Sequence, residues 1–383
     1  DWSSDVCSSD LVHIPFCVKK CGYCDFLSWC GTSEEKETYV QALLKEIESY
    51  REFARGYRVS TVFVGGGTPS VLEAGQMEGV LGNIQEVFEL EKKPEITLEM
   101  NPGTVTEEKL QCYKENGVNR LSIGLQSVKN EKLEVLGRIH SYEEFLESYE
   151  LARKAGFTNI SVDLISSIPG QKLEEWKEEL AALSALSPEH ISVYQLIIEA
   201  ETPFYEKYAE HEELLPDEEE SREIYLWTGS FLKEQGYEQY EISNYAKPGK
   251  ESRHNLKYWE RGDYLGLGLG AASMVRNIRM SNTKDMKTYL ERCGQPKTMR
   301  EDVQFLEEAR QMEEFMFLGL RKTRGVSRKE FRRIFGQEMD MVYEKALHKC
   351  LENGMLKEHK DRVYLSEEGV LLSNAVLSEF LFD

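Results

Sequence analysis

Short apolar runs alternate with helical periods along the first half of the chain. The periodic stretches repeat apolar residues every three or four positions, as at Val40, Leu43, Leu44 and Ile47. The apolar runs predict strands at 11–14, 59–64, 95–100, 120–125, 160–165 and 190–196. The periodic stretches predict helices at 34–53, 77–88, 107–116, 142–155 and 173–186.

This alternation predicts an α/β fold, with a parallel sheet and helices outside it. Eight strand–helix units close a full TIM barrel, so the six units found here predict an open, partial (β/α)6 TIM-like barrel. A glycine run at 65–69 and a turn at 101–103 follow directly after predicted strands. Such barrels keep their sites at the C-terminal ends of the strands, and we expect the functional site there.

The second half of the chain has a different pattern. Residues 200–285 are less regular, apart from an acidic helix at 217–234. Helices at 307–320, 328–335 and 341–352 then precede a hairpin at 355–365 and a last helix at 368–381. This order predicts a winged-helix-like α+β domain. We therefore divide the chain into a barrel with its irregular region at 11–285 and a C-terminal domain at 300–383.

The first ten residues, DWSSDVCSSD, follow neither period and join abruptly to Leu11 and Val12. We treat this segment, 1–10, as an anomalous one, a foreign or truncated start. Cys7 is accordingly not counted as a ligand.

Charge and composition limit the classes of protein to which this chain can belong. The net charge of −21 is spread along the chain, whereas a nucleic-acid binder would usually be basic. No apolar run reaches the ~18 residues of a membrane span, and no secretory signal is visible. Cysteines that are grouped, in a chain without a signal, predict a reducing cytoplasm. One basic run gives the only support for DNA binding, and it comprises Arg321, Lys322, Arg324, Arg328, Lys329, Arg332 and Arg333.

The clearest chemical motif is CxxxCxxC, formed by Cys17, Cys21 and Cys24. Three thiolates at this spacing can hold three irons of a 4Fe–4S cluster and leave the fourth iron open to another ligand. Zinc is the alternative, because it takes four tetrahedral ligands and Cys30 or His13 could supply the fourth. The spacing favours the cluster.

This motif, with an aromatic residue before its last cysteine, resembles that of the radical S-adenosylmethionine (radical SAM) enzymes. The longer string HIPFC…CxYCDF is similar to one branch, the oxygen-independent coproporphyrinogen III oxidases and their relatives, the HemW-type haem chaperones. The stretches SVDLISSIPGQ, YEISNYAKPG and HNLKYW extend the resemblance over nearly the whole chain. It implies the same partial barrel, a 4Fe–4S cluster and S-adenosylmethionine. The Tyr that this family places just ahead of HIPFC is missing here.

The resemblance also implies which residues contact S-adenosylmethionine. The turn after the second strand, with Gly66, Gly67 and Thr68, corresponds to the motif that holds its amino group, although by itself it would be read as an ordinary tight turn. Phe26 matches an aromatic position that flanks the cluster. An Arg suits a carboxylate and carboxylates suit ribose hydroxyls. The implied contacts on the rims of later strands are Glu99, Gln126, Arg138 and Asp163.

Two positions distinguish the oxidases from the haem chaperones within this branch. The oxidases carry a fourth cysteine two residues after the third, where this chain has Phe26. The string HNxxYW resembles a haem-chaperone signature, and its His254 is implied as a haem ligand. Imidazole is a common haem ligand, and axial ligation needs a His on an accessible face; a structural His beside aromatic residues is the alternative. The run 266–270 superficially matches a dinucleotide fingerprint, but it lacks the strand–turn–helix setting and is predicted to be a structural turn.

The resemblance therefore implies a chaperone that binds a cluster, S-adenosylmethionine and haem, and passes haem to apo-haemoproteins of the respiratory chain. No catalytic residue is assigned, no nucleic acid is expected, and membrane association would be transient, through partners. The alternative is an oxidase that decarboxylates coproporphyrinogen III by way of a 5′-deoxyadenosyl radical. The oligomeric state and the identity of the haem acceptors stay open.

Overall fold

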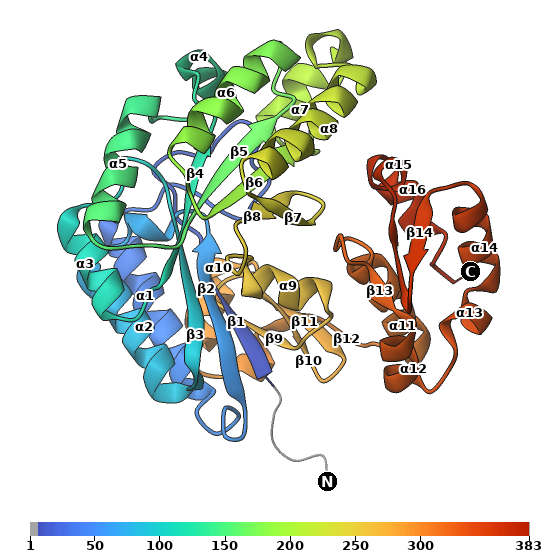
Figure 1. The fold of residues 1–383 in the computed structure, drawn as a ribbon. Helices are drawn as coiled ribbons and strands as arrows, with labels where there is room; N and C mark the ends of the chain where they lie inside the picture. The colour runs from blue at the N-terminus through green and yellow to red at the C-terminus, as the bar shows by residue number, and fades with distance from the viewer. Residues whose placement is uncertain (1–6, 383) are drawn as a thin grey trace.

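The computed structural model describes residues 7–382, which form an open barrel and a C-terminal domain (Figure 1). Six parallel strands lie side by side in chain order, each paired with the next. They are β1 (Cys7–Ile14), β2 (Arg58–Gly66), β3 (Glu89–Met100), β4 (Arg120–Gln126), β5 (Ile160–Ser166) and β6 (His190–Gln195). The predicted partial barrel is confirmed.

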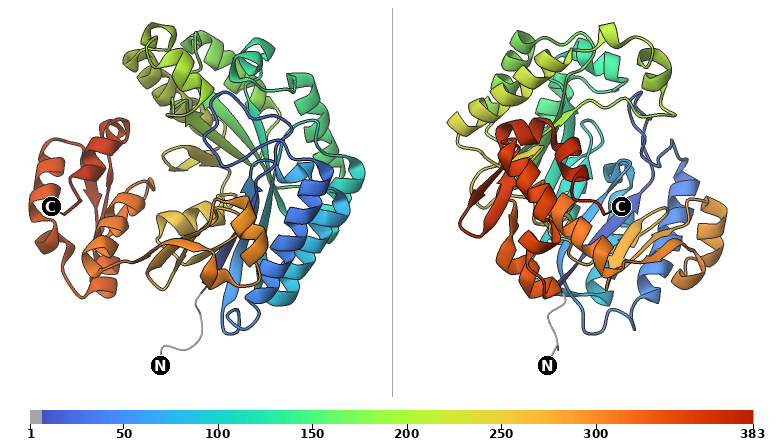
Figure 2. Two further views of the ribbon diagram at one scale, coloured as in Figure 1. Left: turned by 180° about the vertical axis from the view of Figure 1, so that it is seen from behind. Right: turned by 90° about the vertical axis from the view of Figure 1, so that its right-hand side faces the viewer.

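Helices cover the outer face of this sheet (Figures 1 and 2). They are α1 (Ser33–Ser49), α2 (Ala74–Val87), α3 (Glu107–Glu115), α5 (Tyr142–Lys154) and α6 (Leu173–Ala185). Alternation along each strand places apolar residues such as Ile96, Leu98 and Ile123 in the core beneath the helices. The opposite positions, such as Glu99 and Asp163, therefore face the inside of the barrel.

β1 begins at Cys7, four residues before the predicted strand. Residues 7–10 pair with β2, and 9–10 also pair with β9, so the prediction that this stretch has no strand character is wrong for them. Residues 1–6 lie outside the described residues, and so does the side chain of Cys7. In the part of the chain that the structure describes, no helix has the length and apolar character needed to cross a membrane.

Short antiparallel strands extend the sheet at both edges. β9 (Tyr264–Leu267), β10 (Ala272–Val275), β11 (Ile278–Asn282) and β12 (Arg300–Phe305) continue from β1, while β8 (Asn244–Ala246) and β7 (Glu238–Glu241) continue from β6. No hydrophobic period predicts these strands, nor the helices α4 (Asn130–Leu136) and α7 (Pro203–Tyr208). The acidic helix is α8 (Glu218–Glu234), close to its predicted bounds.

The glycine run 266–270 begins in β9 and continues from Gly268 as a structural turn, which a buried carboxylate of α1 binds. Glu46 is fully buried and accepts hydrogen bonds from the Gly268 N–H (2.8 Å), the Tyr289 hydroxyl (2.6 Å) and the Asn282 amide (2.7 Å). The same turn donates its Leu269 N–H to the Tyr39 hydroxyl (3.1 Å). These contacts give the turn a structural role within the protein, as predicted.

Glu46 should give the stability of the apoprotein a measurable pH dependence. Burial raises the pKa of Glu46 from 4.5 to about 7. Between these values the folded state binds the proton that the unfolded state has lost, so stability falls as pH rises from about 4.5 through 7. The expected loss is up to about 3 kcal/mol. Urea unfolding between pH 4.5 and 8 measures it. Glu46→Gln should reduce the slope, and the slope that remains is expected from Glu99, whose pKa burial raises to about 8.

The control is Glu34→Gln, an exposed glutamate in the first turn of the same helix. It should leave the slope of the wild type unchanged. A Glu46→Gln profile with the same slope as the wild type would contradict the prediction.

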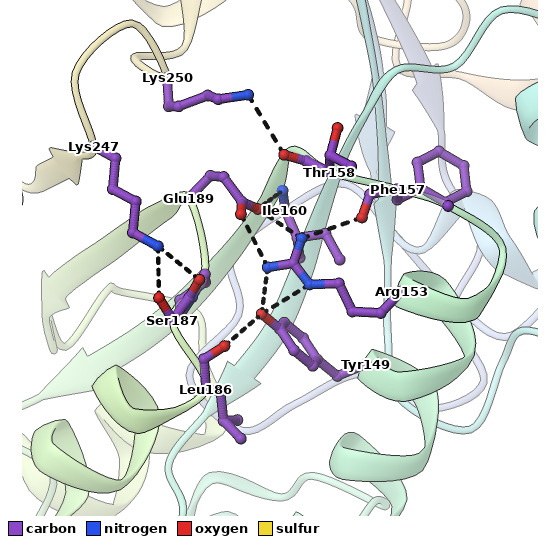
Figure 3. Close-up of polar contacts among 12 residues, drawn as sticks. Tyr149, Arg153, Phe157, Thr158, Ile160, Leu186, Ser187, Glu189, Lys247 and Lys250 are labelled. Carbon is purple, nitrogen blue, oxygen red and sulfur yellow. Dashed lines mark hydrogen bonds and ion pairs between the residues drawn. The ribbon is translucent and has the colours of Figure 1, made fainter.

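Arg153 and Glu189 belong to a polar network (Figure 3). It lies at the N-terminal ends of β5 and β6, whereas the expected site lies at the C-terminal ends of the strands. The two side chains form an ion pair (2.8 Å), and Glu189 also accepts from the N–H of Ile160, the first residue of β5 (3.0 Å). Arg153 donates to the Tyr149 hydroxyl (2.6 Å), which donates to the Leu186 carbonyl (3.1 Å). This network joins α5 to the N-terminal ends of β5 and β6.

The C-terminal domain has its own hydrophobic core, which includes Met316, Phe331, Val363 and Phe380. Its elements are α11 (Glu308–Gly319), β13 (Val326–Ser327), α12 (Arg328–Phe335), α13 (Met339–Val342), α14 (Glu344–Glu352), β14 (Leu356–His359), β15 (Arg362–Leu365), α15 (Glu367–Leu371) and α16 (Ser373–Ser378). The three strands form one sheet in the order β13-β15-β14. The winged-helix-like arrangement is as predicted, although two predicted helices, 341–352 and 368–381, are each split in two.

The basic run of this domain is engaged with carboxylates and an aromatic ring. Arg328 pairs with Asp340 and Glu358, and Arg332 pairs with Glu338. Within the same run, Arg321 lies over the Trp259 ring, Arg324 and Lys322 pair with Glu260, and Arg333 lies 3.9 Å from Glu330. These cations serve contacts within the protein.

Candidate functional site

The cysteine motif lies on a loop that leaves the C-terminal end of β1. Short backbone contacts close the loop at its base: the Cys17 N–H donates to the Trp29 carbonyl (2.9 Å) and the Trp29 N–H to the Pro15 carbonyl (3.0 Å). Farther out, the Gly22 N–H donates to the Leu136 carbonyl (3.2 Å). The three cysteines are partly exposed, so the loop is fixed while its thiols stay accessible.

Polar side chains connect two of these thiols to later strand ends. The Thr68 hydroxyl lies 3.5 Å from Cys17 Sγ and accepts a hydrogen bond from the Asn101 amide (2.7 Å). The side-chain amide oxygen of Asn101 accepts from Arg138 (2.7 Å), whose other terminal nitrogen lies 3.6 Å from Cys21 Sγ. Thr68 and Arg138, which the family resemblance implies as S-adenosylmethionine contacts, are thus joined to the cysteines through Asn101.

The glycine turn packs so closely that side chains would not fit. A Cβ on Gly66, whose φ is +109°, would overlap the ring of His13, and a Cβ on Gly67 would lie 2.7 Å from the Phe16 carbonyl oxygen. The Gly66 N–H donates to Glu99 (3.1 Å). The predicted residues Gly66, Gly67 and Glu99 therefore form one unit beside the cysteine loop.

Two carboxyl groups face the barrel interior near this unit. Desolvation, with a contribution from the charge of Asp163, raises the pKa of Glu99 to about 8. Burial also raises the pKa of Asp163, which accepts from the Ser122 hydroxyl (3.1 Å). Gln126 ends β4 with a φ of +75°, a strained conformation for this residue and one often found at functional sites.

The donor set fits a cluster with three protein ligands. Three thiols share one loop and are partly exposed, and the backbone of 65–67 packs closely against the start of that loop at Phe16. In residues 7–382, no three His, Cys, Asp or Glu side chains could hold one metal ion together. A cubane does not require that, because each thiolate binds a different iron.

The two residues considered as a fourth zinc ligand have other contacts. The ring of His13 packs on Gly66, and its Nδ1 lies 2.5 Å from the Leu269 carbonyl oxygen. The exposed Cys30 thiol donates to the Val18 carbonyl (3.1 Å).

Phe26, at the end of the cysteine motif, is 62% exposed, so its ring is free to contact a ligand. Its backbone carbonyl accepts a hydrogen bond from Lys20 (2.8 Å).

His254 lies elsewhere, on α9 (Arg253–Trp259), and it is 2% exposed. Its Nδ1 bonds the Thr61 hydroxyl (3.0 Å), its Nε2 bonds the Tyr258 hydroxyl (2.9 Å), and its ring stacks on Phe63. Burial and the charge of Arg120 lower its pKa to about 3. The expectation of an accessible His is therefore wrong for this conformation, because β2 covers the ring.

Sequence reasoning missed Asn101 and Arg120. Asn101 belongs to a turn that was read only as a strand end, although its position two residues after Glu99 was a signal. Arg120 opens β4 and is 2% exposed, and its Nε has no hydrogen-bond partner among the described residues. An Arg at the start of a predicted inner strand was the signal available in that case.

Comparison with known proteins gives matches along most of the chain. The model of the radical SAM superfamily matches residues 11–183, and that of the HemN C-terminal domain matches residues 306–372. Heme chaperone HemW from Bacillus subtilis is 37% identical, over 97% of this chain and 99% of that protein. Heme chaperone HemW from Escherichia coli is also 37% identical, over 97% of each chain.

A relative from an animal and a solved structure extend the likeness. Radical S-adenosyl methionine domain-containing protein 1, mitochondrial, from Danio rerio is 31% identical, over 98% of this chain and 87% of that protein. The structure of coproporphyrinogen III oxidase (HemN) from Escherichia coli, a radical SAM enzyme, superimposes with a TM-score of 0.85. It is 23% identical and covers 98% of this chain and 90% of that chain, so this likeness concerns the fold.

Proposed function

Because the chain belongs to the radical SAM superfamily and, within it, to the HemW family, we propose that it is a haem chaperone. In this proposal it binds a 4Fe–4S cluster, S-adenosylmethionine and haem, and delivers haem to apo-haemoproteins of the respiratory chain. Its place of action is the cytoplasm, and any contact with membranes is transient and runs through those partners.

One observation carries the proposal: a three-thiol loop with Phe26 where the oxidases have a fourth cysteine, in a chain that aligns with HemW proteins over nearly its full length. Cys17, Cys21 and Cys24 would hold the cluster, which supplies an open iron for the amino and carboxylate groups of S-adenosylmethionine. Arg138 would pair with the carboxylate, and the turn at Gly66 and Gly67 would hold the amino group.

The remaining residues would shape this pocket. Glu99 and Asp163 would accept from ribose hydroxyls, Gln126 would line the rim, and Thr68 would hold Cys17 in place. Asn101 would orient Arg138. Phe26 would cover the cluster with an apolar ring.

A paired assay tests this function against the oxidase. The protein is reconstituted with iron and sulfide without oxygen, and one portion receives haem followed by apomyoglobin as an acceptor. The other receives coproporphyrinogen III, S-adenosylmethionine and dithionite. We expect a Soret shift and transfer of haem in the first, and no protoporphyrinogen in the second. Protoporphyrinogen formation, or no haem binding at all, would overturn the proposal.

His254→Ala should weaken haem binding by at least about tenfold, since imidazole supplies the proposed axial bond to iron. A Soret titration measures the affinity. His190→Ala is the matched control, because His190 is equally buried and bonds Ser161 and Tyr240 from inside the barrel. Both variants lose a buried imidazole, so an equal effect of the two on haem affinity would remove His254 as the ligand.

A further inference from the structure

The helix that carries His254 is held from two sides. In Figure 1, α9 lies on the side of the barrel that faces the C-terminal domain. Its first residues contact the barrel, and the residues at its end contact the C-terminal domain. A movement of the C-terminal domain relative to the barrel therefore changes the contacts of α9.

The barrel holds the N-terminal end of α9 through a buried carboxylate. Glu95 of β3 accepts hydrogen bonds from the N–H groups of Arg253 (3.1 Å) and His254 (3.0 Å), which satisfies two free amides of the first turn. The Ser252 hydroxyl accepts from the Asn255 N–H (3.3 Å). The His254 ring then reaches Thr61 inside the barrel, as described above.

The C-terminal domain holds the other end, mainly through residues 321–324, which we call the clamp segment. The Arg321 guanidinium lies 4.6 Å from the centre of the Trp259 ring. Arg324 pairs with Glu260, the residue after the helix, and Lys322 lies 3.8 Å from the same carboxylate. All of these contacts are made with Trp259, the last residue of α9, or with Glu260 directly after it.

Two further contacts anchor this arrangement. Arg261, one residue farther on, forms a buried ion pair with Glu314 of α11 (2.8 Å). The clamp segment also meets the barrel edge, where the Thr323 N–H donates to the Tyr240 carbonyl (3.1 Å). The segment thus bridges α9 and β7.

The contact between the clamp segment and α9 leaves polar groups unsatisfied. Trp259 Nε1 and Arg321 Nε are buried without a hydrogen-bond partner among the described residues. Each such group carries the cost of losing its hydrogen bonds to water. A contact with this cost is suited to opening, because water can satisfy both donors once the surfaces separate.

In this closed arrangement His254 is unable to bind iron. Both of its ring nitrogens are engaged, and the ring is 2% exposed, whereas an axial ligand must offer a free nitrogen to a flat macrocycle. A ligand that binds only a second conformation has its affinity reduced by the fraction of molecules in that conformation. The contacts that bury His254 therefore set the apparent affinity for haem.

We infer that the clamp segment and Glu314 hold α9 against the barrel and keep His254 withdrawn, and that separation of the C-terminal domain from α9 releases this His to bind haem iron. The inference rests on the proposed function, since it takes His254 as the haem ligand. It adds that haem uptake is gated by the C-terminal domain.

The test uses the full, cluster-reconstituted chain and the double variant Arg321→Ala, Arg324→Ala, which removes the ring contact and the ion pair to Glu260. Hydrogen exchange without haem should show faster exchange of α9 amides. The apparent dissociation constant for haem should fall by about tenfold as the open fraction rises by that factor. Adding His254→Ala should abolish the gain.

The matched control is Arg332→Ala, Arg333→Ala, which removes two arginines of the same domain that lie near Glu338 and Glu330 rather than α9. It should change neither α9 exchange nor haem affinity. If the clamp variant binds haem through His254 just as the wild type does, or if α9 exchange is unchanged, the gating is wrong and the proposed function stands. If the wild type binds no haem, or binds it equally without His254, the proposed function or its ligand fails first and the gating falls with it.

Discussion

Replacing Cys17, Cys21 or Cys24 with alanine is expected to abolish the iron–sulfur cluster. A cluster held by only three thiolates has no spare protein ligand, so two thiolates leave two irons open and the cluster is lost. Reconstituted wild type should contain about four irons per chain with broad visible absorbance, and each variant should contain almost none. Iron and sulfide analysis with the absorbance spectrum measures this.

Cys30→Ala is the matched control, because Cys30 is an exposed thiol at the base of the same loop and donates to the Val18 carbonyl. It should retain the full iron content. The opposite pattern, with iron lost in Cys30→Ala or zinc in place of iron in the wild type, would contradict the assignment of the three-thiol cluster. Thermal unfolding of the four variants without the cluster, compared with the wild-type apoprotein, shows whether the protein still folds.

The sequence alone predicted the barrel well because its signal is local. Each strand from β2 to β6 contains an apolar run, and the helices α1, α2, α3, α5 and α6 each carry their own period, so pairing in chain order follows from general rules. The edge strands were missed because β8 has three residues and β9 four, too few for a period. Their place depends on β1 and β6 as templates.

The candidate site was predictable where a motif named the residue and unpredictable where contacts are distant in sequence. The three cysteines and the glycine turn lie close together because parallel strands end at one edge. The bond from Asn101 to Arg138 spans 37 positions, and that from Thr61 to His254 spans 193. The pattern HNLKYW does not predict that His254 is buried, because the residues that cover it, such as Thr61 and Phe63 of β2, are far away in the sequence.

Arg138→Ala is expected to weaken S-adenosylmethionine binding by at least about 100-fold, the second large effect. Its guanidinium is already oriented by the Gly124 carbonyl (2.7 Å) and the Asn101 amide oxygen (2.7 Å), so little freedom is lost when it meets a carboxylate. Charge-assisted bonds contribute roughly 1.5–3 kcal/mol each, and two give this factor. Arg138→Lys keeps the positive charge but loses the two-point contact of the guanidinium, so its affinity for S-adenosylmethionine should lie between those of the wild type and Arg138→Ala. Equilibrium dialysis with labelled S-adenosylmethionine measures the affinity.

Arg153→Ala separates this effect from a general loss of stability. Arg153 is an equally well-bonded arginine, but its network lies at the opposite end of the barrel (Figure 3). Its loss should lower the unfolding temperature and leave the affinity for S-adenosylmethionine unchanged. Because Arg138 also lies 3.6 Å from Cys21 Sγ, iron content is measured in every variant, and only chains with a full cluster are compared. A fully loaded Arg138→Ala protein that binds S-adenosylmethionine as the wild type does would exclude this arginine from the site, and the carboxylate would then have to be bound by another cation near the cysteine loop, such as Lys19 or Lys20.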